Sequence, residues 1–322
     1  MAKPFSQAGG GRNPDLLVTT INQVWNKPGT PEGVIYPKLC YVANGGGSIE
    51  EFPMSAAAVS EKEVADDAER DFSTAYVIDV VSRSRRIDGP AILLPLDDSR
   101  DPYQILQDSG PAIIRRGDRL WDRRLAAAMN SNPVCYDLKT MYATDHPVNP
   151  SVAGSDTYSN DISAEMDEAG LIAALQQLLD IPGADGNRYN ADLGVPTIIV
   201  PTVQLGVKAR KLITPGLIAK VFGANTAAAS ENTRLEGMAE VEVLPELYDA
   251  KVANSNKRWY VSRTNAHPVA PWIVRITRRI QLTLTAPDAH LATTRNSRGL
   301  FYWASGGVDP GLPQTQVRCT TA

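Results

Sequence analysis

Apolar side chains recur at helical spacing from residue 113 onward and predict one long amphipathic helix, which we place at residues 102–130. The apolar positions that share one face are Ile113, Ile114, Gly117, Leu120, Trp121, Leu125 and Ala128. The charged positions assigned to the opposite, solvated face are Arg115, Arg116, Asp118, Asp122 and Arg123. Asn132 should end the helix, because the residue before a proline is pushed out of the helical region. At 1.5 Å per residue this helix is roughly 40 Å long.

Shorter apolar runs around this helix predict strands and two further helices, which indicates a mixed α+β chain with discontinuous domains. We expect strands at residues 75–81, 91–96, 197–200, 240–244, 258–262, 272–276, 280–285 and 298–303, and helices at 163–179 and 203–212. The strand at 280–285 alternates most cleanly, with Ile280, Leu282 and Leu284 on one face. The remaining pieces are predicted as a solvated turn at 82–89, a mobile loop at 223–233 and a Gly- and Pro-rich tail after 303.

The first quarter of the chain lacks such patterning. Residues 1–40 are rich in Gly, Pro, Asn and Thr, and only residues 16–25 form a short amphipathic piece, so one interpretation is a frayed terminus. Residues 50–71 are strongly acidic. Their acids are Glu50, Glu51, Glu61, Glu63, Asp66, Asp67, Glu69 and Asp71. Ser60 and Glu63 stand at capping-box spacing and predict a short helix near 61–70.

The composition and charge of the chain indicate a protein with a buried core that does not bind DNA tightly. The chain has 322 residues and is 43% hydrophobic, enough for a buried core. Its 36 acidic and 32 basic residues leave a net charge of −4, without the basic excess of a tight DNA-binding protein. Arg83, Arg85 and Arg86 form a local basic cluster, which is either a solvated turn or an ion-pair partner for the acidic residues 50–71 of another subunit. The helix arginines largely pair with Asp118 and Asp122 at i,i+3 and i,i+4 spacing, but they could also contact DNA or a neighbour. They are Arg115, Arg116, Arg119, Arg123 and Arg124.

Candidate catalytic residues are few. The three cysteines, Cys40, Cys135 and Cys319, lack CxxC spacing, which favours reduced thiols over a disulfide framework or a zinc site. Cys135 and His146 could act as nucleophile and base, with Asp145 beside them. However, Asp145 and His146 are adjacent and would point to opposite faces of an extended segment, so residues 145–147 are better interpreted as a turn. We therefore expect no enzyme, no cofactor and no metal site.

Targeting signals are also missing from the sequence. No apolar run approaches the roughly 20 residues needed to span a bilayer. Residues 1–15 contain no apolar run after Lys3 and so do not resemble a signal peptide. We expect a soluble protein that is made in the cytoplasm and does not contact a membrane.

Two motifs resemble one family. CYDLKTMYATDHPV, at residues 135–148, follows the predicted long helix, and LLDIPGADGNRYNADLGVPTIIVPTVQLGVKARKLI spans residues 178–213. Both are similar, in order and context, to segments of the Mu-like phage major head subunit family, and the resemblance covers about residues 75–304. It implies the Hong Kong-97-type capsid fold, an α+β fold whose long spine helix crosses a peripheral domain.

The resemblance also implies a domain organisation. Residues 1–40 would form an N-terminal arm that orders on a neighbouring subunit, and residues 41–74 an extended loop. Residues 75–158 and 262–322 would form the peripheral domain with its spine helix, and residues 159–261 the axial domain. An acidic helix in the extended loop would depart from the family's usual β-hairpin.

The function implied is that of a major capsid protein. Many copies would assemble in the host bacterial cytoplasm into pentamers and hexamers, forming the icosahedral head of a virion around double-stranded DNA. Scaffolding, portal and decoration proteins are possible partners, and contact with the DNA would be weak and non-specific. The candidate inter-subunit contacts are Trp25, Glu61, Glu63, Asp66, Asp67, Arg83, Arg85, Arg86, Arg115 and Arg116. The alternatives are an encapsulin-type compartment shell or a cysteine-dependent hydrolase that uses Cys135 and His146.

Overall fold

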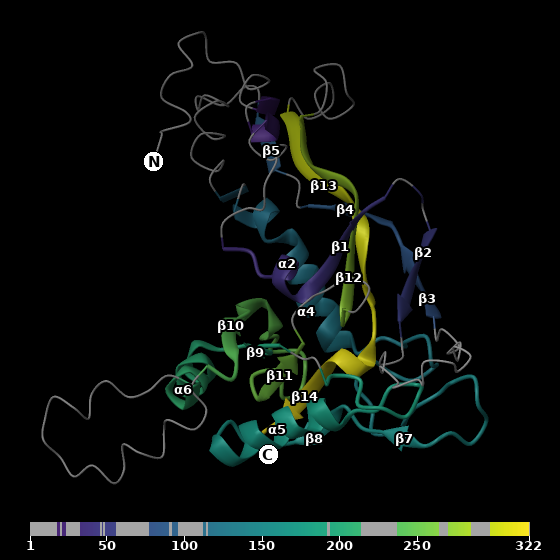
Figure 1. The fold of residues 1–322 in the computed structure, drawn as a ribbon. Coiled ribbons are helices and arrows are strands. Elements are labelled where there is room, and N and C mark those ends of the chain that lie inside the picture. The colour runs from purple at the N-terminus through teal and green to yellow at the C-terminus, as the bar shows by residue number, and fades with distance from the viewer. Residues whose placement is uncertain are drawn as a thin grey trace, which may run out of the picture.

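The structure of the chain is a computed structural model, and two separate sheets organise it (Figure 1). The structure describes residues 18–19, 21–23, 33–45, 47, 49–55, 77–89, 92–95, 112–113, 115–191, 194–213, 237–263, 270–284 and 297–321. The predicted helix near 61–70, the predicted helical residues 102–111 and the loop predicted at 223–233 lie outside these residues.

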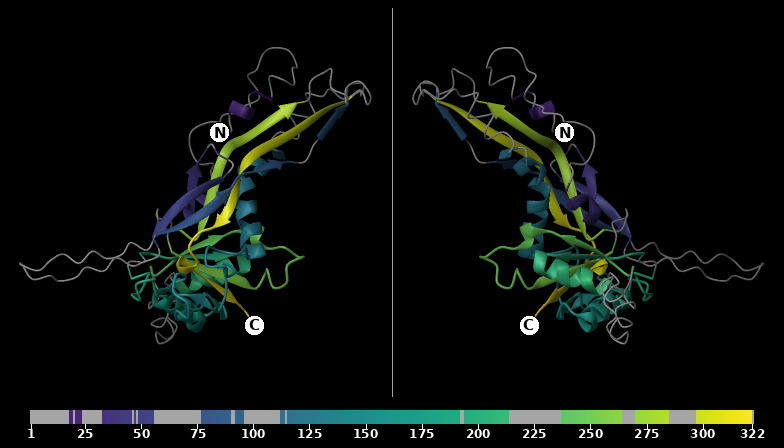
Figure 2. Two further views of the ribbon diagram at one scale, coloured as in Figure 1. Left: turned by 90° about the vertical axis from the view of Figure 1, so that its right-hand side faces the viewer. Right: turned by 90° about the vertical axis from the view of Figure 1, so that its left-hand side faces the viewer.

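The first sheet, which we call the long sheet, is built on two strands of 13 and 14 residues that run antiparallel. Its strands are β1 (Cys40–Asn44), β12 (Trp272–Leu284), β13 (Ser297–Pro310), β4 (Arg85–Asp88) and β5 (Ile92–Pro95). β1 pairs in parallel with β12, whereas β4 and β5 both pair antiparallel with β13. Seen from the side, β12 and β13 run from the teal and green elements around the C-terminus to the opposite end of the molecule (Figure 2).

The second sheet, which we call the compact sheet, has the order β10-β9-β11-β14-β8. Its strands are β10 (Glu240–Val243), β9 (Thr197–Val200), β11 (Arg258–Ser262), β14 (Gln316–Thr320) and β8 (Asp161–Ser163). Two helices pack on it, α5 (Glu168–Asp180) and α6 (Val203–Ile213), as the sequence predicted. The side chains of Leu178, Ile198 and Trp259 are fully buried between these elements.

The predicted long helix corresponds to α4 (Leu120–Ser131), which packs on β12 and β13 of the long sheet (Figure 1). Residues 112–113 and 115–118 ahead of it are also helical. The predicted end at Asn132 is confirmed, and this residue adopts a left-handed conformation with φ of 48°, as helix C-caps do.

One charged residue of α4 does not lie where the pattern placed it. Asp122 was assigned to the solvated face but is only 1% exposed. Its carboxylate accepts hydrogen bonds from the backbone N–H groups of Ile35, at 3.1 Å, and Tyr36, at 2.8 Å. These groups begin the short helix α2 (Tyr36–Leu39), so Asp122 binds the otherwise unpaired donors of that helix. Burial raises the pKa of Asp122.

A two-stranded hairpin stands beside the long sheet. β2 (Ile49–Ser55) pairs antiparallel with β3 (Val77–Arg83), from Ile49 opposite Arg83 at one end to Ser55 opposite Val77 at the other. The predicted extended loop at 41–74 therefore contains a strand of this hairpin. At the start of that range, Cys40–Asn44 form strand β1 of the long sheet.

Three further predictions were wrong in detail. The solvated turn at 82–89 is instead the end of β3 followed by β4, because Ile87 gives this piece a buried side chain. The two strands predicted at 272–276 and 280–285 are one strand, β12, with register shifts around Arg278. The short ladder of β6 (His146–Pro147) and β7 (Thr157–Tyr158) replaces the turn at 145–147.

The predicted tail after residue 303 is also wrong, since β13 continues to Pro310 and β14 lies inside the compact sheet. The short 3-10 helix η3 (Pro313–Thr315) links these two strands, and another, η2 (Pro245–Leu247), follows β10. Val317 and Cys319 of β14 are fully buried. The sequence-based division grouped all of residues 262–322 with the long helix, whereas β14 pairs with β11 and β8. The division into domains stays a prediction.

Candidate functional site: a groove edged by arginines

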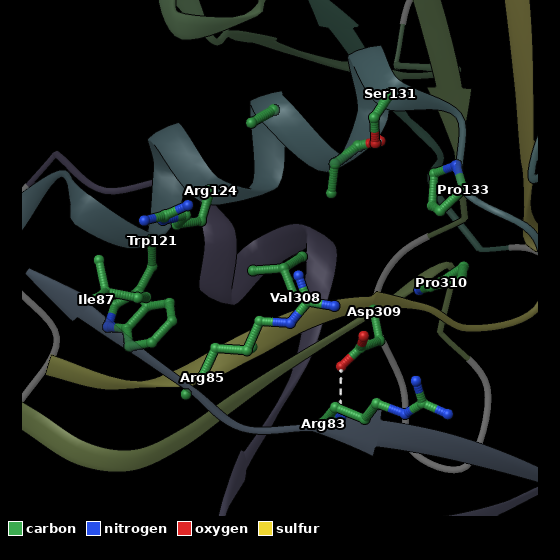
Figure 3. A pocket seen from close by; sticks show the side chains of 14 residues that line it. Arg83, Arg85, Ile87, Trp121, Arg124, Ser131, Pro133, Val308, Asp309 and Pro310 are labelled. Carbon is green, nitrogen blue, oxygen red and sulfur yellow. Dashed lines mark hydrogen bonds between the residues drawn. The ribbon is translucent and has the colours of Figure 1, made fainter.

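A groove of about 410 Å³ runs between α4 and the strands β3, β4 and β13 (Figure 3). Three arginines edge it, Arg83 from β3, Arg85 from β4 and Arg124 from α4, and all three are exposed. Apolar parts of the lining come from Ile87, Trp121, Ala127, Ala128, Pro133, Val308 and Pro310. We call this the arginine groove. Figure 3 shows Arg85 extending from its strand toward Val308, with Arg124 on the helix side.

Close packing of helix and sheet brings these residues together. A Cβ at Gly306 would lie 2.2 Å from the backbone oxygen of Arg275 and 2.5 Å from the Trp121 ring. Glycine therefore lets Trp121 of α4 lie directly on β13. On β4, Arg85 and Ile87 share one face because strand residues two apart point the same way.

The groove is cationic. Among its lining residues Asp309 is the one acid, and its carboxylate accepts hydrogen bonds from Ser82 Oγ at 2.7 Å and from the Arg83 backbone N–H at 3.2 Å. Burial raises the pKa of Asp309, against the opposing effect of these donors and the nearby arginines. Within the described residues the three guanidinium groups form no ion pair, so they remain available for carboxylate or phosphate oxygens.

The predicted basic cluster of three arginines is divided between the two faces of the sheet. Arg86 lies on the face opposite to Arg85, as strand alternation requires. Its Nε is 2.8 Å from Asp88 Oδ1, and its guanidinium lies 5.4 Å from the centre of the Trp303 ring. Arg278 of β12 lies 5.6 Å from the same ring. Arg83 and Arg85 therefore share a surface that Arg86 does not.

The other predicted contact residues are placed as follows. Arg115 and Arg116 are exposed on the helical residues ahead of α4 and do not line the arginine groove. Trp25 and the four acids Glu61, Glu63, Asp66 and Asp67 lie outside the described residues. Arg124 was among the helix arginines named as able to contact DNA or a neighbour, whereas Asp309 was not predicted. Nothing in the sequence links Asp309 to Arg83.

The hypothetical catalytic residues are not assembled. The Cys135 thiol is buried, which raises its pKa, and it lies 3.5 Å from the sulfur of Met141. Asp145 is exposed and pairs with Lys139. The fully buried His146 has its Nδ1 2.5 Å from a carboxylate oxygen of Asp137, a partner that the sequence analysis missed. Among the described residues no imidazole is hydrogen-bonded to this thiol, so the geometry there lacks the activation that a thiol nucleophile needs.

The described residues lack two further kinds of feature. No group of three His, Cys, Asp or Glu side chains there could hold a metal ion. None of the helices in that part of the chain has the length and apolar character needed to cross a membrane.

A long two-stranded arm with a helix along it, a projecting hairpin and a separate compact sheet together define a capsid-type architecture, the α+β Hong Kong-97-type fold. The capsid structure of the cyanophage P-SCSP1u shares it with a TM-score of 0.53 at 11% identity, over 92% of this chain and 90% of that chain. The capsid of the native GTA particle shares it with a TM-score of 0.50 at 14% identity, over 92% and 95%. No protein-family model and no curated protein matches the chain.

Proposed function

We propose that this chain is the major capsid protein of a tailed phage or a related particle. Many copies would form pentamers and hexamers that close into an icosahedral head around double-stranded DNA. The observation that carries the proposal is the fold shared with the cyanophage capsid over 92% of this chain. The motifs at 135–148 and 178–213 favour the Mu-like branch of such proteins. Assembly in the host bacterial cytoplasm, and scaffolding, portal and decoration partners, belong to the same proposal.

The contacts between copies would include a charge pairing. The acidic residues Glu61, Glu63, Asp66 and Asp67 belong to the segment that joins β2 to β3. The hairpin starts this segment at Ser55 and ends it at Val77, whereas Arg83 lies at the opposite end of the same hairpin. Seven residues of strand span about 20 Å. Both ends of the acidic segment are thus anchored at the end of the hairpin away from the arginine groove, and we propose that its acids pair with the groove of another copy.

The remaining predicted contacts have separate roles in this proposal. Arg86, with Arg278 and Trp303, would contact neighbours through the other face of the long sheet. Arg115 and Arg116 would do so ahead of α4, and Trp25 within the N-terminal arm. DNA contact by any of these arginines would be weak, because the chain as a whole carries a net charge of −4.

The test of the function is the assembly state of the full chain. We expect size-exclusion chromatography with light scattering, followed by negative-stain microscopy, to find rings, tubes or closed shells as the concentration rises. A monomer at every concentration, both alone and after co-expression with the proteins of its own particle, would contradict the proposal. The contents of particles from the natural source separate the alternatives, because a phage head holds DNA and an encapsulin-type shell holds protein cargo.

A charge swap tests the pairing separately. The first variant carries Arg83→Glu, Arg85→Glu and Arg124→Glu in the arginine groove, and we expect it not to assemble. The second carries Lys in place of Glu61, Glu63 and Asp66 and should fail in the same way. One chain with all these changes restores opposite charges and should assemble again. Normal assembly of the first variant, or no rescue in the combined chain, would rule out this pairing but not the function.

A further inference from the structure

Arg275 is a fully buried arginine that joins the long sheet to both strands of the hairpin. It belongs to β12 and its side chain is 0% exposed. Nη1 donates a hydrogen bond of 3.0 Å to the Ser82 carbonyl of β3, and Nη2 donates one to the Gly47 carbonyl just before β2. Nε lies 3.1 Å from a carboxylate oxygen of Glu50 in β2, an ion pair without the alignment of a hydrogen bond.

Asp309, on the neighbouring strand β13, also binds the hairpin and carries the charge opposite to that of Arg275. Its carboxylate accepts from the Ser82 hydroxyl and from the Arg83 backbone N–H, at the end of β3 where Arg275 also binds. Ile273, two residues before Arg275, is the register partner of Asp309. Two oppositely charged side chains from adjacent strands therefore hold one short stretch of the hairpin base.

Two glycines leave space for these contacts. A Cβ at Gly45 would lie 2.1 Å from the Glu50 carboxylate and 3.1 Å from Arg275 Nε. A Cβ at Gly307 would lie 2.3 Å from the Arg83 carbonyl and 3.2 Å from the Asp309 carboxylate. A larger residue at Gly45 would displace the Glu50 carboxylate, and one at Gly307 would push away the backbone of β3 at Arg83.

The hairpin depends on this contact for its direction. Within the described residues β2 and β3 pair only with each other and share no ladder with the long sheet. Phe52, Met54 and Val80 of the hairpin pack against Ile273 in a small apolar cluster. Apolar packing favours contact without specifying one orientation, whereas hydrogen bonds to fixed carbonyls specify geometry.

We propose that Arg275 and Asp309 form a latch that fixes the direction of the β2–β3 hairpin against the long sheet, and that the hairpin turns as a unit when the latch opens. The latch itself does not depend on the proposed function. Its consequence does, because the direction of the hairpin decides where the acidic segment between β2 and β3 meets another copy.

The test measures the direction and the local opening of the β2–β3 hairpin in the full chain. Spin labels on Asp79→Cys in β3 and Ile172→Cys in α5 report its direction, and both positions are exposed. The native cysteines Cys40, Cys135 and Cys319 are buried and should not take the label. Amide hydrogen exchange in β2 and β3, with β9 and β11 as internal reference, reports local opening.

We expect Arg275→Met to broaden the distance distribution between the labels. It should also speed exchange in β2 and β3 about tenfold or more, while exchange in β9 and β11 stays the same. Glu50→Gln and Asp309→Asn remove one charge each and should produce smaller changes of the same kind. Glu51→Gln is the matched control, since Glu51 is the next residue of β2 and points away from Arg275.

Unchanged distances and exchange in Arg275→Met would overturn the latch and leave the apolar cluster and the hydrogen bonds of Ser84 to Thr277 and Ser305 as the support. If that variant unfolds, which faster exchange in β9 and β11 would reveal, Glu50→Gln and Asp309→Asn decide alone, and no change in either overturns the proposal. The outcome is distinct from that of the function test. A chain that never assembles can keep its latch, and a chain with a freely turning hairpin still belongs to an assembling protein if shells or tubes form.

Discussion

The two sheets of this molecule rest on different kinds of contact. The compact sheet is closed mainly around apolar side chains such as Trp259, Ile198 and Leu178, all fully buried, with the Arg318–Asp161 pair joining β14 to β8. The long sheet also has an apolar core, but charged side chains on it and on α4 bind the backbone of the elements packed against them. Asp122 holds the start of α2, Arg275 holds the hairpin, and Asp309 binds the end of β3.

This difference indicates a division of labour. Apolar burial supplies most of the free energy of folding but specifies orientation poorly, so it suits a region that only has to be stable. Buried charges add little net stability and impose geometry, so they suit a region whose strands must project in fixed directions. For a shell subunit, the compact sheet would supply stability and the long sheet the direction of its contacts.

The largest effect should come from Trp259→Ala in the compact sheet. Trp259 is 0% exposed, and its indole N–H donates to the Ala164 carbonyl at 3.1 Å. Truncation leaves a cavity and an unpaired carbonyl, so we expect the free energy of unfolding, from urea titration of the dissociated chain, to fall by about 3–5 kcal/mol. Trp303→Ala on the half-buried face of the long sheet is the control and should cost less than half as much. Equal losses would contradict the comparison.

The compact sheet was also the easier region to predict. The strands Thr197–Val200 and Arg258–Ser262 have the bounds that their short apolar runs indicated, and the helices on this sheet match within a few residues. Local pattern sufficed because each element buries one continuous apolar face. The exception is β14, whose partner β8 lies more than 150 residues earlier in the chain. No local pattern reveals a pairing of that kind.

The next largest effect should come from Gly306→Ala at the contact of α4 with the long sheet. The added Cβ would lie 2.2 Å from the backbone oxygen of Arg275, and backbone cannot move aside as a flexible side chain can. We expect a loss of about 1–3 kcal/mol in the free energy of unfolding, measured by urea titration. Ser305→Ala, at the preceding residue and on the opposite face, removes only the hydrogen bond of 3.0 Å to Ser84 Oγ and should cost less than Gly306→Ala, about 0.5–1.5 kcal/mol. A neutral Gly306→Ala would mean that the strands and α4 are packed more loosely than the structure has them.

Removing the Asp122 carboxylate should cost about 2 kcal/mol. Asp122→Ala leaves the N–H groups of Ile35 and Tyr36 buried without their acceptor, and an unpaired buried donor costs about 1–3 kcal/mol. Part of this loss is offset, because the carboxylate itself is destabilised by burial. Thermal unfolding of the full chain measures the change, and Asp122→Asn, which keeps one acceptor oxygen, should lose less. Equal losses in both variants would show that the charge matters rather than the acceptor.

The site illustrates what the sequence cannot provide. The cluster of Arg83, Arg85 and Arg86 was visible, but which of the three share a surface depended on recognising a strand instead of a turn. Asp122 was assigned to solvent because helical periodicity carries no information about α2, which arrives from 86 residues earlier to meet it. Arg275 lies in a strand with an ordinary sequence pattern, and its partners Gly47 and Ser82 come from the first third of the chain. Contacts between distant segments determine all three cases.

The pH dependence of Asp309 should be smaller but has a definite sign. Burial raises its pKa above the usual value near 3.8, so the folded chain holds this proton more tightly than the unfolded chain. The resulting stabilisation is fully present below that usual value and is lost as the pH rises through the raised pKa. We therefore expect wild type to lose free energy of unfolding relative to Asp309→Asn as the pH rises through this window. Urea titrations of both chains at several pH values check the sign, and the opposite trend would mean that the donors outweigh burial.

The smallest effect should come from the ion pair that joins α4 to the 3-10 helix after β10. Arg119 Nη1 lies 3.0 Å from Glu246 Oε1, with the two side chains 48% and 15% exposed. We expect a double-mutant cycle of Arg119→Ala and Glu246→Ala to give a coupling of about 0.2–1 kcal/mol that weakens with added salt. The pair of Arg188 with Asp180 of α5 is the control beside the compact sheet. Its atoms are 2.8 Å apart, but the side chains are 67% and 43% exposed, so it should couple less. A larger, salt-resistant coupling at Arg119 would mean that a charged contact also fixes how α4 lies against the compact sheet. Charge would then direct contacts beyond the long sheet.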